Sequence, residues 1–178
     1  MIRLNLFKTI PGQLLASILA GCLCLSVAAA NAPKSIAILN FYDREEQIHT
    51  DGEKLGMLIF AKLAEYDDVR MLERENIDKI MAERKLTAAG MTSGKQSLEL
   101  GAMLGADYIL TGRIYTLDGS INFSAKLLNC RNAAVSGIIG SYPENMKKSE
   151  MLEAFANKAA AQIRKILEAK KNEKTAQQ

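Results

Sequence analysis

The sequence predicts an α/β fold: a single-domain α/β sandwich in which helices pack against a mixed β-sheet. The first observation is residues 108–117, a run rich in β-branched and aromatic residues that follows Gly105, where a helix C-cap belongs. The second is Asp118-Gly119, a strong hairpin signal, with apolar and polar residues alternating through 121–128 after it. The third is amphipathic helical spacing on both sides of this hairpin.

The elements follow in a definite order. Residues 34–41 are almost continuously apolar, which is typical of a strand covered on both faces. Thr50 and Glu53 have the spacing of a capping box and predict the start of a helix. The remaining predicted elements are a short strand at 69–72, helices after residue 73 and at 97–104, strands at 108–117, 121–128 and 135–142, and a long amphipathic helix at 149–167. The predicted order is therefore β-α-β-α-α-β-β-β-α.

Three segments are expected along the chain. Residues 1–30 have a basic start and an uncharged apolar middle ending in small residues, the pattern of a secretory signal, and this predicts export. Residues 34–168 are expected to form the folded domain. Residues 169–178 are expected to be a polar tail.

The end of the signal has two interpretations. Cleavage after Ala30 would use Ala28 and Ala30 as the small residues and would release the protein. Alternatively, Leu19-Ala20-Gly21-Cys22 resembles a bacterial lipobox, in which Cys22 would be the lipidated first residue. Leu23 and the apolar residues after it fit the first interpretation better. In that case Cys22 is one more apolar residue of the signal core.

Charge and cysteine content exclude several classes of function. Without the signal's two basic residues, 21 basic residues face 20 acidic ones, so no basic field predicts nucleic-acid binding. Late cleavage would leave Cys130 as the one thiol, which rules out an internal disulfide. Cys130 and His49, the one histidine, lack clustered partners, so we expect no metal site. We also expect no cofactor.

No catalytic constellation is visible in the sequence. Residues 90–96 superficially suggest a phosphate-binding loop, but the spacing is one residue short and Gln96 stands where Ser or Thr is needed. Asp107 lies at a helix-to-strand junction, where a turn-capping carboxylate is commoner than a general base. We therefore expect a protein that is not an enzyme, with no catalytic residues.

Three segments in series resemble a known family. They are Ala-Ile-Leu-Asn-Phe at 37–41, Leu-Glu-Arg at 72–74 followed by Ile-Met-Ala-Glu at 80–83, and Leu-Gly-Ala-Asp-Tyr-Ile-Leu-Thr-Gly at 104–112. Their order is similar to that in the CsgG-like family of curli production assembly and transport components. Related folds occur in the penicillin-binding-protein activator LpoB and the amino-terminal domain of TolB. The resemblance covers most of residues 36–142.

The resemblance implies a non-enzymatic accessory protein of the bacterial cell envelope, periplasmic or associated with the outer membrane, that supports assembly or secretion. Its partners would be envelope proteins of unknown identity or further copies of itself, and it would contact the membrane only through a lipid anchor. The family's secretion channel carries two long pore hairpins, which have no room at 118–119 or 129–134. The expected match is thus to the family's soluble domain. Alternatives are an oligomeric scaffold of a secretion channel and an activator of a cell-wall synthase.

Glu73 and Arg74 are the candidate docking residues. They lie at a strand-to-helix junction within one of the three matching segments. A docking surface is one interpretation of this pair. The other is local: Glu73 would interact with the positive end of the helix dipole, and Arg74 would pair with a neighbouring carboxylate.

Overall fold

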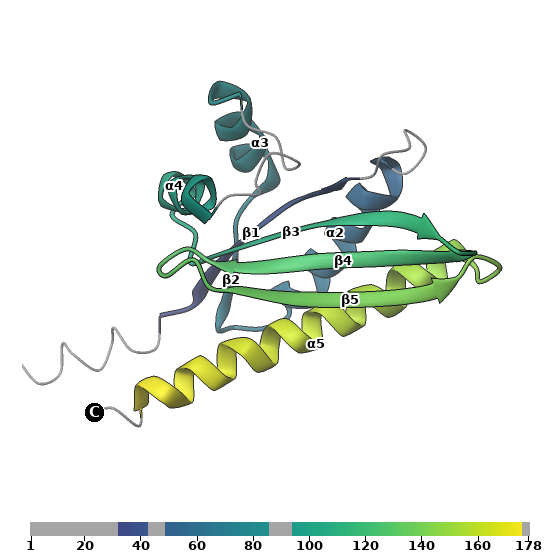
Figure 1. Cartoon of the computed structure of the whole chain (residues 1–178). Coiled ribbons are helices and arrows are strands. Elements are labelled where there is room, and N and C mark those ends of the chain that lie inside the picture. Colours follow the sequence, from purple (N-terminus) through teal and green to yellow (C-terminus); the bar gives the residue numbers. More distant parts are fainter. Residues whose placement is uncertain (1–31, 43–48, 86–93, 176–178) are drawn as a thin grey trace, which may run out of the picture. The chain divides into compact units, whose positions relative to one another are not determined.

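Figure 1 shows the computed structural model, which describes residues 32–42, 49–85 and 94–175. Within these ranges, nine elements follow one another in the predicted order. They are β1 (Lys34–Tyr42), α2 (His49–Ala64), β2 (Val69–Met71), α3 (Arg74–Glu83), α4 (Gly94–Leu104), β3 (Tyr108–Leu117), β4 (Ser120–Asn129), β5 (Val135–Pro143) and α5 (Lys148–Thr175).

The five strands form one mixed sheet in the order β2-β1-β3-β4-β5. β1 is parallel to both of its neighbours, and Ile36 is in register with Tyr108 of β3. The other half is an antiparallel meander, in which β3 pairs with β4 along its whole length and β4 pairs with β5. The predicted α/β class, the mixed sheet and the element order are confirmed.

Both predicted glycine positions have the backbone conformation that favours glycine. Gly105 has φ of 63° directly after α4, the left-handed geometry of a helix C-cap. Asp118 and Gly119 have φ of 50° and 69° between β3 and β4. Two consecutive positive φ angles define the type I′ turn that matches the twist of paired strands. A two-residue connection of this kind leaves no room for an inserted hairpin.

Helices cover the two faces of the sheet unequally (Figure 1). α2 and α5 pack on one face and enclose the larger core, which includes Phe41, Phe123 and Phe155. α3 and α4 pack on the other face, where their apolar residues meet Ala37 and Leu39 of β1. No helix among the described residues covers the outer part of this second face, on β4 and β5. Helices therefore cover β1 on both faces of the sheet, whereas the described helices cover β5 on one face.

Two helix boundaries differ from the predictions. α2 begins at His49, so Thr50 lies inside the first turn and is not the N-cap residue. α5 continues to Thr175, eight residues past the predicted end at 167. The apolar stripe that predicted this helix ends at Leu167, which still belongs to the larger core. Polar residues then extend the helix through good intrinsic propensity.

Gly112 allows a close approach inside the larger core. A Cβ atom built on Gly112 would lie 2.4 Å from a ring carbon of Phe41 and 2.5 Å from the carbonyl oxygen of Ser124. Phe41 is 1 % exposed, so its ring has no free space to move into. The absence of a side chain at Gly112 is thus what lets Phe41 lie across the sheet. Gly137 of β5, by contrast, has no atom within 4 Å of such a Cβ.

We predict that Gly112→Ala lowers the free energy of unfolding by roughly 1–3 kcal/mol, because the added methyl group overpacks the core against Phe41. Gly137→Ala is the matched control and should leave stability unchanged or raise it by about 0.5 kcal/mol, since the unfolded chain loses freedom. Urea unfolding of both purified variants measures the difference. Equal midpoints for the two variants would contradict this account of the core.

Candidate functional site

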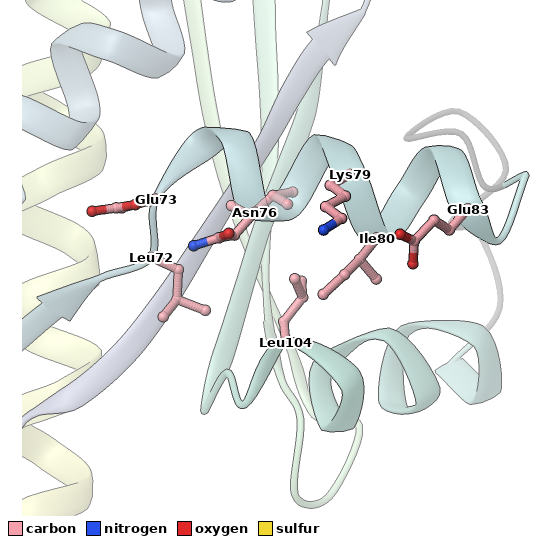
Figure 2. A pocket seen from close by; sticks show the side chains of 8 residues that line it. Leu72, Glu73, Asn76, Lys79, Ile80, Glu83 and Leu104 are labelled. Carbon is pink, nitrogen blue, oxygen red and sulfur yellow. The ribbon is translucent and has the colours of Figure 1, made fainter.

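The candidate site is a groove between α3 and α4 (Figure 2), with a volume of about 430 Å³. In Figure 2, Ile80 of α3 and Leu104 of α4 point toward one another across it. Its lining residues are Leu72, Glu73, Asn76, Ile77, Lys79, Ile80, Glu83 and Leu104.

Helical periodicity builds the groove. Ile77 and Ile80 are one turn apart on α3, so they face the same side, and Ile77 is fully buried in the smaller core against β1. Leu104 is the last residue of α4, and the left-handed Gly105 ends the helix there. The groove consequently has an apolar floor. Its charged lining residues are two carboxylates, Glu73 and Glu83, and one ammonium group, Lys79, a formal charge of −1.

The two predicted docking residues are in different surroundings. Glu73 lines the groove and is the N-cap residue of α3, although its side chain makes no capping hydrogen bond. Arg74 is not among the lining residues. Its Nε donates to Asp78 at 3.1 and 3.2 Å, and its terminal nitrogen donates to the Asn40 side chain of β1. Arg74 thus pairs with a neighbouring carboxylate, as in the local interpretation, and it also joins α3 to the central strand. The docking role of the pair remains a prediction.

Asp107 is the best-connected carboxylate in the described residues. Its Oδ2 accepts hydrogen bonds from the backbone N–H of Ser35 at 3.0 Å and from the Ser35 hydroxyl at 3.1 Å. Its Oδ1 accepts from Arg131 at 2.8 Å. Its backbone N–H donates to the Ser35 carbonyl, and its carbonyl accepts from the N–H of Cys130. Asp107 therefore joins β1, the start of β3 and the turn after β4.

These contacts decide the ionisation of Asp107. Burial alone would raise its pKa, but hydrogen bonds from Ser35 and Arg131, together with the charge of Lys34, outweigh burial and lower the pKa below its usual value. A carboxylate with a lowered pKa is a poor general base, because it holds a proton only weakly. The observed role agrees with the turn-capping alternative.

The neighbouring Cys130 is equally unreactive. Burial, and then the charge of Asp107, raise the pKa of its thiol to about 11, so the thiol stays protonated at neutral pH. A Cβ atom on Gly101 of α4 would lie 2.5 Å from its Sγ, which shows how closely the helix packs over it. Cys130 acts as a small hydrophobic residue between α4 and the sheet.

Some of the residues singled out in the sequence lie outside the described ranges. They include Cys22 with the rest of the signal segment, and residues 90–93 of the loop that superficially suggests a phosphate site. His49 begins α2, but its side chain also lies outside the description. In the described ranges no three potential ligands gather around a metal position. None of the helices in those ranges has the length and hydropathy needed to span a bilayer.

Sequence reasoning found Glu73 but missed the groove itself. Ile80 and Leu104 are far apart in the sequence, and nothing local indicates that their helices lie side by side. The helical period of α3 was a usable signal, because Ile77 and Ile80 mark an apolar face. The sequence did not indicate that α4 is the element that this apolar face of α3 contacts.

The fold and this groove define an α/β sandwich module in which Asp107 and Arg74 join separate elements of the structure. Its family is established by comparison. The family model described as "Curli production assembly/transport component CsgG" matches residues 27–126, more than half of the chain. The chain belongs to the CsgG family, and the predicted resemblance is confirmed.

Two solved structures, a lipoprotein and TolB, agree on the fold. Lipoprotein GNA1162 from Neisseria meningitidis is 17% identical with a TM-score of 0.54, covering 74% of this chain and 96% of that one. TolB from Acinetobacter baumannii is 12% identical with a TM-score of 0.53, covering 76% of this chain and 28% of that one. The LpoB C-terminal domain from Salmonella enterica is 8% identical with a TM-score of 0.44, covering 64% and 84%. No curated protein matches the sequence.

We predict that Asp107→Asn lowers the free energy of unfolding at neutral pH by roughly 1–3 kcal/mol, because charge-assisted hydrogen bonds are lost. The folded-state pKa lies below the unfolded value of about 3.9, so the ionised carboxylate stabilises the fold fully above that pH. This contribution disappears as the pH falls through the folded-state pKa. Urea unfolding at pH 7 and in acid should therefore show a gap between wild type and variant that narrows in acid.

Asp78→Asn is the control for Asp107→Asn. Asp78 forms an exposed i,i+4 pair with Arg74, which is worth only about 0.5 kcal/mol. A gap for Asp107→Asn that stays constant with pH would show that ionisation is not the source of its stabilising effect.

Proposed function

We propose that this protein is a non-enzymatic accessory module of the cell envelope, exported from the cytoplasm, which supports assembly or secretion by docking to other envelope proteins. The observation that carries the proposal is the match to the CsgG family across residues 27–126. That match supports an assembly-related role as the broad class. The engaged state of Asp107 and the protonated thiol of Cys130 support a role without catalysis.

The groove between α3 and α4 is the surface we assign to docking. It combines an apolar floor with an accessible acidic rim, as expected of a surface that buries a partner's side chains and orients them by charge. Glu73 and Glu83 are both exposed, so a partner can reach them without a change in the fold. A partner that presents apolar and basic side chains fits this chemistry best.

We predict that the double variant Glu73→Lys with Glu83→Lys recovers the envelope partner at least about tenfold less than wild type, since reversal of two rim charges repels a basic surface. The measurement is cross-linking in cells, followed by affinity purification from envelope extracts. The matched control is Glu53→Lys with Glu65→Lys, a reversal of two exposed carboxylates on or beside α2, which should recover the partner normally.

Two outcomes would count against this assignment. Equal recovery by both double variants would remove the groove from docking. Repeated recovery of the chain alone, despite cross-linking, would overturn the binding module itself.

Membrane attachment is tested separately. If Cys22 is the lipidated first residue, a radioactive fatty acid should label the wild-type protein and fail to label Cys22→Ser. The chemical reason is that the thiol is the site of thioether attachment in a lipobox protein. Cys24→Ser is the control and should retain the label. Absence of label from wild type would instead favour release after cleavage near Ala30.

A further inference from the structure

β5 is an unguarded edge strand. Among the strands that the structure describes, it is the last of the sheet and pairs only with β4. It is nine residues long, and none of its residues is charged. Exposed edge strands normally carry lysine, a bulge or an early proline, which prevent another strand from adding to the free N–H and C=O groups. In β5 the one proline, Pro143, occupies the final position and leaves the rest of the edge free to pair.

The opposite edge of the same sheet is protected. β2 has only three residues, and its central residue, Arg70, is exposed. A short strand with a charged centre can offer few hydrogen bonds to a newcomer. The contrast between the two edges shows that the missing protection is particular to β5.

β5 also presents exposed apolar side chains on one face of the sheet. Val135 and Ile139 are 56% and 64% exposed and lie on the face that no described helix covers. The other face of β5 is occupied, because α5 packs there. A Cβ atom on Gly140 would lie 2.7 Å from the ring of Phe155. A partner for β5 is therefore expected beside the strand and over its uncovered apolar side chains.

We propose that β5 pairs in antiparallel fashion with β5 of a second copy of this chain, about a two-fold axis at Ile139. Ile139 is the middle residue of the strand, so this register pairs all nine residues. It also keeps each side chain opposite one of the same face, as antiparallel pairing requires. The two five-stranded sheets become one continuous sheet of about ten strands, a size within the range of natural sheets.

Self-complementarity selects a second copy as the occupant. In this register Ile139 faces its own symmetry mate, which brings two exposed apolar side chains together. Val135 faces Pro143 of the other copy, another uncharged pair. Because neither strand carries charge, the association has no like-charge repulsion to overcome. The charged side chains of this face lie on the inner strands, as Lys126 of β4 does beside Gly137, so the edge strand itself carries no charge that would select a charged strand of a different protein.

The purified wild-type protein should be a dimer at micromolar concentration by light scattering and sedimentation equilibrium. We predict that Ile139→Lys raises the dimer dissociation constant at least about tenfold, because two lysines would meet at the axis. Leu117→Lys is the matched control. Leu117 is 57% exposed on the same uncovered face but belongs to β3, away from the edge, so this variant should remain dimeric.

A cysteine pair tests the register directly. Directly opposed residues of antiparallel strands have Cβ atoms about 4.5–5.5 Å apart, close enough for a disulfide after a small adjustment. Mild oxidation of Ile139→Cys should yield a covalent dimer that reducing agent dissolves. Two controls are oxidised in parallel. Wild type reports any disulfide through the native cysteines, and Leu117→Cys reports disulfides formed by random collision. Neither control should form a covalent dimer.

Three results would overturn the proposal. They are a wild-type monomer at micromolar concentration, an oligomer unaffected by Ile139→Lys, and no covalent dimer of Ile139→Cys. A wild-type monomer would overturn the proposal even if a strand of another protein were then found to pair with this edge. The outcome is independent of the groove assignment, because rim charge reversal at Glu73 and Glu83 should leave the dimer intact.

Discussion

The contact between Asp107 and Ser35 is the constraint on which the sheet depends. Ser35 opens β1, and Asp107 directly precedes β3, so their hydrogen bonds set the parallel register at the centre of the sheet. Arg131 holds the other carboxylate oxygen and ties in the turn before β5. One ionised side chain thereby joins β1, the start of β3 and the turn between β4 and β5. The Ser35 hydroxyl also donates to the Gly105 carbonyl, which places the end of α4 against the same point.

The groove and the uncovered edge both follow from this arrangement. Once β1 and β3 are fixed side by side, α3 and α4 have one place to bury their apolar residues, over the β1 half of the sheet. Their separation leaves the groove, and their position leaves the β5 half uncovered on that face. The larger core on the opposite face is closed by α2 and α5. Each helix pair thus does a different task, since one closes the core and the other shapes an accessible surface.

Local signals in the sequence were sufficient for the elements and insufficient for their arrangement. Gly105 and Asp118-Gly119 require unusual backbone angles, so they marked a helix end and a turn without tertiary information. The insertion of β1 between β2 and β3 depends on contacts across long separations, which no local pattern encodes. For the site, the junction at Glu73 was visible, but Leu104 opposite Ile80 and the role of Arg74 at Asn40 were not. The predicted helix start at Thr50 was wrong because a helix boundary can shift by one residue at little cost in free energy.

The central position of β1 has a consequence for how the protein acquires its structure. Ser35 and Asp107 are 72 residues apart, and synthesis starts at the amino terminus. The first strand to emerge therefore waits for more than half of the domain before both of its neighbours exist, and long-range parallel pairing is intrinsically slow. During that interval its apolar residues, which are buried in the finished molecule, are available for premature association. We expect newly made chains to need a holding chaperone until β3 is complete.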